Sequence, residues 1–461
     1  MDGLFHTRAS PRICLDLGTS YSKASVFLGP HAIGEACLAP LRLGDVSGAG
    51  HSYFTPTAIY LDQDRLHCGP KALMRAEAGV RAKRDPILSF KMVLAARDIE
   101  GTLALKVGPS VDPSRTMTYR DALVLYLAYL DQLLRAAILV DRHLPDSLVD
   151  APVRLTSPFW QNGYAASQTL RRLFLEAETV SARLGPALIS PEGACLDTVR
   201  SALQQASHVA GASRYAGVVM EVEAVAAAYA NFADTSADRL IVMDIGAGTT
   251  DIAGFARIGG DSVNGLAEIK AARTCCSFAG DEIDTVVVDQ MLRRSGASSA
   301  EAKAQVWRAL RLSARELKQT LLESGKCSLK LNGRRTVLGR KALLNDPAFK
   351  DFCRSLAKVL AKSMEAAIAD AGAKAGPHSI TVCLAGGGAH LPDADAIVTQ
   401  AARYCRGAVK VRIERFSIGL ARRRIAGGHE RFDKTFSQIV IALGGALAEL
   451  PREAVGAERA A

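Results

Sequence analysis

Two short stretches of the chain decide the fold: DLGTSYSKASVF at residues 16–27 and DIGAGTTDIAGF at residues 244–255. Aligned, they share an aspartate, a glycine, a hydroxyl residue and a final phenylalanine: Asp16 with Asp244, Gly18 with Gly246, Ser22 with Thr250, and Phe27 with Phe255. Each stretch follows an apolar run, ICL or LIVM, which is typical of a buried strand, and each continues into a second strand-like run. The sequence therefore predicts two related strand–turn–strand units in an internally duplicated chain.

The two turns suit contact with phosphate. A Walker A loop needs Ser or Thr after its lysine, but Lys23 is followed by Ala24, and Asp251 stands where the dinucleotide fingerprint needs its third glycine. With both of these phosphate-binding motifs excluded, the remaining interpretation is a hairpin whose glycines let backbone N–H groups approach phosphate oxygens. Carboxylates beside phosphates are explained by a hydrated Mg²⁺ between them, so Asp16, Asp244 and Asp251 predict a metal–phosphate cleft between two lobes. The alternative for either hairpin alone is an ordinary β-turn.

A third glycine cluster follows in the stretch ITVCLAGGGAHLP at residues 380–392. An apolar, strand-like run leads into three glycines and a proline, and residues 393–404 then show helical spacing. Backbone at such a strand–glycine–helix junction can lie flat against a nucleoside or its phosphates. A flexible turn is the alternative.

Bulk composition indicates an ordinary globular protein. The 461 residues allow two or three domains, and 49% hydrophobic with 23% charged residues excludes a disordered or fibrous chain. A net charge of +10 permits acidic partners but, spread over this length, gives no evidence for nucleic acid. The densest basic stretch, residues 403–434 with Arg422–Arg424, is interpreted as a solvated face, with an acidic docking partner as the alternative.

The cysteines and the N-terminus indicate a cytoplasmic protein. Ten cysteines occur without a CxxC pair, and Cys14 and Cys383 lie in apolar runs, as small core residues do in a reducing compartment. The first residues, MDGLFHTRAS, lack the apolar segment of a secretory signal. No zinc or iron–sulfur site and no secretion are expected.

The most membrane-like stretch, residues 123–140, is predicted to be a buried helix. It contains Asp131 and Arg135, which a membrane span would rarely carry. Thr118 followed by Asp121 is a cap-like start for such a helix. No membrane span is therefore expected.

The three loops, in this order, resemble those of the actin, sugar-kinase and 70-kDa heat-shock protein ATPase superfamily. DLGTSYSK resembles its first phosphate motif, DIGAGTTD its second, and LAGGGAHLP its adenosine motif. The closest similarity is to the nucleotide-binding domain of the DnaK-type chaperones, which further segments resemble: TPTAIYL (55–61), GPKA (69–72), RDPILSFK (84–91), LTSPFWQNG (155–163), EVEAVAAAY (221–229), FAGDEID (278–284), RELKQTL (315–321) and ALGGALAEL (442–450). The resemblance runs from about residue 12 to 450.

This resemblance implies an α/β, actin-like two-lobed ATPase fold. Two duplicated mixed-sheet subdomains of ribonuclease H-like topology, each with an inserted smaller subdomain, would surround a nucleotide cleft. Residues 1–235 would form lobe I with the first phosphate loop and the catalytic-lysine insert, and residues 236–430 lobe II with the second phosphate loop and the adenosine loop. Residues 431–450 would form a closing helix that returns to lobe I, and residues 451–461 a flexible tail.

It also implies roles for individual residues in binding ATP and Mg²⁺. The residues that would hold Mg²⁺ through water are Asp16, Glu221 and Asp244. The residues that would act in catalysis are Lys91, Glu221, Asp244, Thr249 and Asp251, with Asp244 or Asp251 orienting the attacking water. The residues that would contact the nucleotide are Gly18, Thr19, Ser20, Tyr21, Lys23, Gly246, Ala247, Gly248, Lys318, Gly386, Gly387 and Gly388. The alternatives are turn formers for the threonines and solvated surface charges for Lys91 and Glu221.

Some residues depart from the chaperone pattern. A lysine at the position of Lys23 is typical of actin-like members, so Lys23 and Lys91 both become candidates for the phosphate-binding lysine. Ala247 replaces a glycine of the second loop, and Val222 stands where the chaperones have a proline that relays the nucleotide state. Around Lys318 three residues replace the usual glutamate, arginine and serine, which leaves base selectivity open: Arg315, Gln319 and Leu322.

The favoured function is an ATP-binding, slowly ATP-hydrolysing switch that acts on a protein partner. After Leu450 only the short stretch PREAVGAERAA follows, so the peptide-binding domain of the chaperones is not expected. The main alternative is an actin-like filament-forming ATPase for cell shape or DNA segregation, which leaves self-association open. A small-molecule kinase ranks third, and the retained carboxylates argue against a non-hydrolysing scaffold.

Overall fold

The computed structural model describes residues 10–29, 37–80, 83–158, 163–233, 237–258, 265–370, 378–416, 425–426 and 435–451. Parts of five stretches discussed above lie outside the described residues. They are residues 1–9 of the N-terminus, residues 159–162 of LTSPFWQNG, residues 417–424 and 427–434 of the basic stretch, residues 431–434 of the expected closing helix, and residues 452–461 of the tail.

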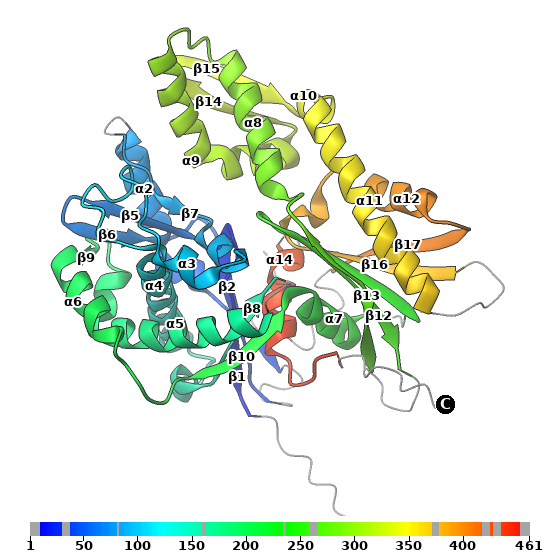
Figure 1. Cartoon of the computed structure of the whole chain (residues 1–461), viewed down its shortest axis with the longest axis horizontal. Coiled ribbons are helices and arrows are strands. Elements are labelled where there is room, and N and C mark those ends of the chain that lie inside the picture. The colour runs from blue at the N-terminus through cyan, green and yellow to red at the C-terminus, as the bar shows by residue number, and fades with distance from the viewer. Residues whose placement is uncertain are drawn as a thin grey trace, which may run out of the picture.

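Lobe I is built on a mixed sheet whose centre is the first predicted hairpin (Figure 1). The two strands of this hairpin pair antiparallel, with Asp16 directly opposite Lys23. Across the sheet the order is β10-β8-β1-β2-β3, in which β3 is antiparallel to β2 while β8 and β10 run parallel to β1. The strands are β1 (Arg12–Asp16), β2 (Tyr21–Phe27), β3 (Leu38–Leu41), β8 (Val153–Ser157) and β10 (Tyr215–Met220), with the short β4 (Thr55–Pro56) also paired to β2.

Lobe II repeats this sheet. Its order is β13-β12-β11-β16-β17, in which β11, β12 and β13 pair antiparallel while β16 and β17 run parallel to β11. The strands are β11 (Arg239–Ile245), β12 (Thr250–Arg257), β13 (Leu266–Cys276), β16 (His378–Ala385) and β17 (Val409–Arg415). Read from the opposite edge, order and strand directions are those of lobe I, which confirms the predicted duplication.

Each lobe contains a smaller inserted unit, as the fold prediction requires. In lobe I it is a four-stranded sheet with two helices: β5 (Ala58–Asp62), β6 (Arg65–Cys68), β7 (Ile87–Leu88), β9 (Ala194–Cys195), α2 (Gly69–Ala78) and α6 (Leu196–Ala206). In lobe II it is a hairpin with three helices: β14 (Lys326–Leu331), β15 (Arg334–Gly339), α8 (Gly280–Arg294), α9 (Ala300–Ser324) and α10 (Arg340–Leu344). The fold is therefore the predicted actin-like, two-lobed α/β fold.

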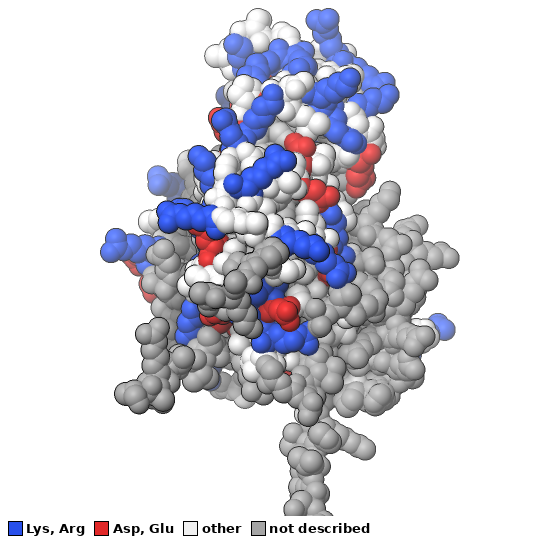
Figure 2. Space-filling view, turned by 90° about the vertical axis from the view of Figure 1, so that its right-hand side faces the viewer, with Lys and Arg blue, Asp and Glu red and all other residues white. Residues whose placement is uncertain are grey.

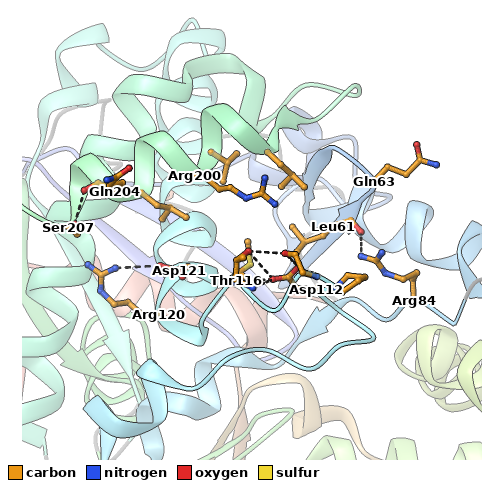
Figure 3. Close-up of a pocket in the computed structure, with 16 residues that line it drawn as sticks. Leu61, Gln63, Arg84, Asp112, Thr116, Arg120, Asp121, Arg200, Gln204 and Ser207 are labelled. Atoms are coloured by element: carbon orange, nitrogen blue, oxygen red, sulfur yellow. Dashed lines mark hydrogen bonds and ion pairs between the residues drawn. The ribbon is translucent and has the colours of Figure 1, made fainter.

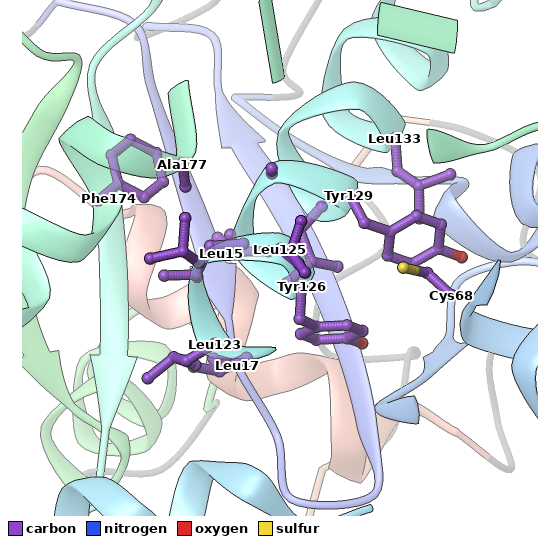
Figure 4. Packing of buried hydrophobic residues seen from close by; sticks show 14 of the residues in the cluster. Leu15, Leu17, Cys68, Leu123, Leu125, Tyr126, Tyr129, Leu133, Phe174 and Ala177 are labelled. Carbon is purple, nitrogen blue, oxygen red and sulfur yellow. The ribbon is translucent and has the colours of Figure 1, made fainter. Parts of the chain in front are cut away.

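The core of lobe I is organised around the predicted apolar helix, α4 (Tyr119–Val140). A capping box starts it: the Asp121 amide donates to the Thr118 hydroxyl (3.1 Å), and the Thr118 amide donates to the Asp121 carboxylate (2.9 Å). Of the described helices only α4 is long and apolar enough to cross a membrane, yet most of its apolar stretch is buried inside the protein. Figure 4 shows its side chains, such as Leu125 and Tyr126, packed beside Leu15 of β1. The prediction of a buried helix is confirmed.

Further helices complete the layers around the sheets. In lobe I they are α1 (Leu43–Ser47), α3 (Ile99–Ala104) and α5 (Gly163–Leu184), and in lobe II α11 (Pro347–Asp370) and α12 (Ala394–Tyr404). Helix α12 is the helix predicted after the third glycine cluster.

Two helices pack against each other between the sheets and join the lobes: α7 (Glu221–Phe232) and α14 (Phe436–Ala446). Their contact is close, because a Cβ on Gly444 would lie 1.8 Å from the Ala224 carbonyl oxygen. Helix α14 is shorter than the predicted closing helix over residues 431–450. It ends at Ala446 since Leu447 turns to extended backbone (ψ 151°), a few residues before Pro451, and helices seldom continue up to a proline.

All ten cysteines are free thiols. Cys14 lies on β1 and Cys383 on β16, and both are buried in the cluster of apolar side chains between the lobes. The prediction that these two are small core residues is confirmed.

The positive charge of the chain lies largely on lobe II. Residues 326–370 and 378–415 contain fifteen Lys and Arg but only seven Asp and Glu. Figure 2 shows the side of the molecule that carries α11, α12 and β17, where blue side chains outnumber red ones. Along α11 four exposed cations follow one another at intervals of one turn: Lys350, Arg354, Lys358 and Lys362. The described part of the predicted basic stretch thus belongs to a wider solvated face.

Candidate active site

A cavity of about 490 Å³ lies where the two central hairpins face each other. All predicted site residues line it except Gly248 and Asp251; they are Asp16, Gly18, Thr19, Ser20, Tyr21, Lys23, Lys91, Glu221, Asp244, Gly246, Ala247, Thr249, Lys318, Gly386, Gly387 and Gly388. Asp251 lies just behind the wall, where it accepts a hydrogen bond from the Thr249 hydroxyl (2.9 Å). Gly248 lies close to the first loop, since a Cβ added to it would be 2.8 Å from Met92 Sδ and 3.0 Å from Thr19 Cγ2.

Asp16 is fixed at the end of β1 by two partners. Its Oδ1 accepts a hydrogen bond from the Thr156 hydroxyl of β8 (2.7 Å), and its Oδ2 lies 2.7 Å from Lys23 Nζ. All three side chains are buried. The antiparallel register places Lys23 directly across from Asp16, so this ion pair follows from the hairpin itself.

The first loop is braced from the insert of lobe I. Thr57 donates its hydroxyl to the Gly18 carbonyl (2.8 Å), and its amide to the Ser20 carbonyl (2.9 Å). A Cβ on Gly18 would lie 2.1 Å from the Tyr21 carbonyl oxygen, so this tight loop requires glycine there. The loop backbone is therefore held rigid at the wall of the cavity.

Lys91 and Glu221 form a buried ion pair at the centre of the cavity. Lys91 lies on the 3₁₀ turn Phe90–Ala95 and donates to Glu221, the first residue of α7. Only 4% of Lys91 and 8% of Glu221 is exposed, so the alternative that these are solvated surface charges is wrong. Burial acts to lower the pKa of Lys91, but the carboxylates around it, Glu221 above all, outweigh burial and raise that pKa.

Asp244 occupies the corresponding place in the second hairpin but has no lysine opposite it. Its cross-strand neighbour is Asp251. Burial, followed by the charges of Glu221 and Asp251, raises the pKa of Asp244 well above its usual range. Its buried Oδ1 has no hydrogen-bond partner among the described residues, and Gly386 lies directly over that atom, since a Cβ on this glycine would be 2.2 Å from it.

These residues fit a hydrated magnesium ion. Negative charge is in excess, because four buried carboxylates face two lysines: Asp16, Glu221, Asp244 and Asp251 against Lys23 and Lys91. Oxygen ligands are those that Mg²⁺ prefers, and it usually retains several of its waters. In the described parts of the chain no three acidic, His or Cys side chains converge closely enough to ligate one ion directly. The donor set therefore suits an ion held through water, with the unpartnered Asp244 oxygen available to it.

The raised pKa of Asp244 predicts how the metal-free domain responds to pH. The folded state holds a proton on Asp244 at pH values where the unfolded state, in which the pKa of this carboxyl is about 4, has lost it. Folding then binds protons, so the free energy of unfolding decreases as pH rises from about 4 through the raised pKa. We expect the Tm measured in EDTA to fall with increasing pH over this range, and Asp244→Asn to flatten the slope. An unchanged slope in the variant would contradict this assignment.

The second loop is held by the segment FAGDEID, residues 278–284. The Gly280 amide donates to the Gly246 carbonyl (3.0 Å), and the Asp281 amide to the Ala247 carbonyl (2.7 Å). Lys318 of α9 lines the cavity, and its Nζ donates to the Gly280 carbonyl (2.9 Å) and pairs with Asp284 (2.9 Å). Lys318 thus braces the wall of the cavity through its ammonium group.

Other lining residues were absent from the predicted set: Ile245, Gly280, Ile283, Arg315, Gln319, Leu322, Glu323, His390, Leu391, Gln438 and Ile441. Arg315, Gln319 and Leu322 lie on one face of α9 together with Lys318, and helical spacing could have assigned them. His390 and Gln438 come from separate segments that meet only in the folded chain, so no local pattern indicates them.

Contacts between the lobes close one side of the cavity. The Arg315 guanidinium of α9 donates to the Ser89 hydroxyl of lobe I (2.8 Å). Further along α9, Arg308 Nε lies 3.5 Å from an Asp85 carboxylate oxygen. We refer to these two contacts as the α9 bridge. Opening the cavity on this side requires both to break.

Comparison with known proteins agrees with this geometry. The family model described as Hsp70 protein matches residues 178–407, a range that includes Glu221, the second hairpin and the third glycine loop. A chaperone protein dnaK1 of Prochlorococcus marinus (strain SARG) is 28% identical over 258 residues, 53% of this chain and 38% of the relative. Another dnaK1, from Prochlorococcus marinus subsp. pastoris, is 29% identical over 147 residues, 31% of this chain and 21% of the relative. The matches thus span well under half the length of these relatives.

The family match covers one half of the duplication, and the structure extends the likeness to the other half. The sheet of lobe I has the topology of the sheet of lobe II, and the first hairpin faces the second across the cavity. The chain is therefore similar to the Hsp70 proteins, and its two-lobed fold supports a place in the Hsp70/actin-like ATPase superfamily, with a chaperone-like nucleotide-binding domain.

Proposed function

We propose that this domain binds ATP with Mg²⁺ between its lobes, hydrolyses it slowly in the cytoplasm, and thereby switches its affinity for a protein partner. The observation that carries the proposal is the pair of facing hairpins around the buried Lys91–Glu221 ion pair. Members of the matching family hydrolyse ATP in general, and the residues of this cavity have the chemistry that such hydrolysis needs.

The carboxylates would hold the metal, and the loops would hold the phosphates. Asp16, Glu221 and Asp244 would bind Mg²⁺ through water, and the bound ion neutralises phosphate charge. Backbone N–H groups of the loops at Gly18 and Gly246 would donate to phosphate oxygens. These groups are fixed before the nucleotide enters, which is how charge stabilisation becomes effective in a water-poor site.

We assign the phosphate-binding role to Lys91 and a positioning role to Lys23. Lys23 lies across the hairpin from Asp16 and pairs with it at 2.7 Å, so it fixes that carboxylate. Lys91 reaches the cavity from the insert and pairs with Glu221. Once a bound metal neutralises Glu221, the Lys91 ammonium group could leave this carboxylate and bind a phosphate oxygen instead. Thr249 lines the cavity and donates its hydroxyl to Asp251, so Thr249 would orient the attacking water and Asp251 would accept the proton through that hydroxyl.

The hydrolysis step is tested by single-turnover assays with radiolabelled ATP. We expect the wild-type domain to release phosphate, and Asp251→Asn to bind ATP with similar affinity but release phosphate at least about tenfold more slowly. An absence of phosphate release by the wild type, or equal rates for both proteins, would contradict the proposal.

The α9 bridge predicts how fast nucleotide leaves. The Arg308–Asp85 pair is partly exposed, and such pairs contribute about 0–1 kcal/mol. Removing it by Arg308→Ala should therefore speed ADP release by up to about fivefold, with little change in association rate. Stopped-flow displacement of a fluorescent ADP analogue measures both rates.

A double-mutant cycle provides the control for the α9 bridge. If the pair itself slows release, Asp85→Asn should have the same effect as Arg308→Ala, and the double variant should be no faster than either. Additive effects would mean that the two residues act separately and would contradict the assignment.

A further inference from the structure

We propose that a second cavity, within lobe I and apart from the nucleotide cavity, binds a small amphipathic anion, with an acidic headgroup on a short aliphatic body. This cavity has a volume of about 560 Å³, which lies in the range of about 300–1,000 Å³ that is usual for small-molecule sites. It lies between helix α6, the loop before α4 and the strand β5 (Figure 3). It shares no lining residue with the nucleotide cavity.

The inner wall of the cavity is apolar and belongs to the core of lobe I. Its apolar side chains are Leu61, Met117, Leu196, Val199 and Leu203. None of the lining residues is aromatic, so the cavity offers no surface on which a base or an aromatic ring would stack. An aliphatic chain matches this wall.

The carboxylates at the cavity are already occupied by neighbouring donors. Asp112 accepts hydrogen bonds from the amides of Ser114 (3.0 Å), Thr116 (2.7 Å) and Met117 (2.8 Å), and from the first two hydroxyls as well. Burial acts to raise the pKa of Asp112, but these bonds outweigh burial and lower it. Asp121 is engaged in the capping box of α4. Neither carboxylate forms an ion pair with Arg84 or Arg200 among the described residues.

Two arginines at the cavity therefore have guanidinium N–H groups that can donate to a ligand. The Arg84 guanidinium is anchored by two neutral carbonyls, those of Leu61 (2.8 Å) and Val111 (2.7 Å), and its buried Nε has no partner among the described residues. Among the described residues Arg200 pairs only with Asp197 on its own helix (3.0 Å), an exposed contact that is easily exchanged. Figure 3 shows Arg200 extending from α6 and Arg84 on the other side, with Asp112 between them.

A ligand with one anionic end and one aliphatic end would match both the arginines and the apolar wall of the cavity. Its headgroup would accept hydrogen bonds from a guanidinium whose fork geometry suits carboxylate and phosphate alike. Its aliphatic body would cover the apolar wall. This apolar contact distinguishes the proposed site from a site for a free inorganic ion. Both features come from described residues and are independent of the proposed ATPase function.

The experiment is a calorimetric titration of the full chain, without nucleotide, with octanoate and with octyl phosphate below their micellar concentrations. We expect saturable binding at one site for at least one of the two, and the tighter one identifies the preferred headgroup. 1-Octanol has the same chain without a charge and should bind at least about tenfold more weakly. No saturable binding of either anion, or octanol binding equally well, would overturn the proposal.

A matched pair of variants on the surface helix α6 tests where the anion binds. Leu203→Glu and Leu203→Gln have almost the same shape, and Leu203 is only partly buried, so both should fold. Only the first places a negative charge in the cavity, and we expect it to weaken octanoate binding at least about tenfold relative to Leu203→Gln. Arg84→Gln should weaken it by about 10- to 100-fold. Equal affinities for the two Leu203 variants would contradict the site.

Discussion

Lys91→Met is expected to lower the rate of ATP hydrolysis by about 10²–10³-fold, the usual effect of removing one group that stabilises developing charge. Lys91 is the buried cation that reaches the cavity from the insert, where only 4% of it is exposed and Glu221 is its partner. Methionine keeps much of its length and apolar stem but removes the charge. Single-turnover phosphate release at saturating ATP and Mg²⁺ measures the loss.

The matched control for Lys91 is Lys23→Met. Because Lys23 pairs with Asp16, its loss should weaken the affinity for Mg²⁺ while turnover at saturating Mg²⁺ changes less than for Lys91→Met. Thr156 still donates to Asp16 in that variant, so the carboxylate keeps one of its two partners. If Lys23→Met removed turnover while Lys91→Met left it intact, the two roles would be reversed and our assignment wrong.

Gly386→Ala is expected to destabilise the metal-free domain by about 2–5 kcal/mol, from strained backbone and steric overlap together. Gly386 has a φ of +75°, which side-chain-bearing residues rarely adopt, and a Cβ there would lie 2.2 Å from Asp244 Oδ1 and 2.5 Å from the Ile245 carbonyl oxygen. The overlap falls on the oxygen that we assign to the metal site. Thermal and denaturant unfolding in EDTA measure the change.

The adjacent glycine provides the control. Gly387→Ala should leave stability within about 0.5 kcal/mol, as substitutions away from packing features do, because its Cβ would meet no atom nearer than 4.0 Å. Equal destabilisation by the two variants would show that the loop tolerates no side chain at all. The specific contact between Gly386 and Asp244 would then not explain the effect.

Local patterns predicted the hairpins, the glycine loop before α12 and the buried helix α4, because each is encoded within a few neighbouring residues. Continuous apolar runs on both sides of a few turn residues indicate a hairpin of buried strands, and its register then places Asp16 opposite Lys23. The capping box before α4 is likewise local. The inference of two lobes needed only the repetition of one such pattern.

The remaining features depend on contacts between distant segments. The pairing of Lys91 with Glu221 joins residues 130 positions apart, and no spacing rule indicates it. The contact of Arg315 with Ser89 joins residues 226 positions apart and depends equally on tertiary packing. The roles of the site residues come from the resemblance and from this geometry together, and they stay predictions until the variants are measured.

A metal–nucleotide site between the two hairpins is tested most directly by a calorimetric titration of the domain with ATP, in Mg²⁺ and in EDTA, for the wild type and Asp244→Asn. We predict one binding site per chain in the wild type, with affinity that depends on Mg²⁺, and at least about a tenfold loss of that dependence when the Asp244 carboxylate is replaced. Asn preserves the shape of the side chain, so a melting curve confirms that the variant is folded. No ATP binding by the wild type, or the same Mg²⁺-dependent affinity in Asp244→Asn, would contradict a metal–nucleotide site between the two hairpins.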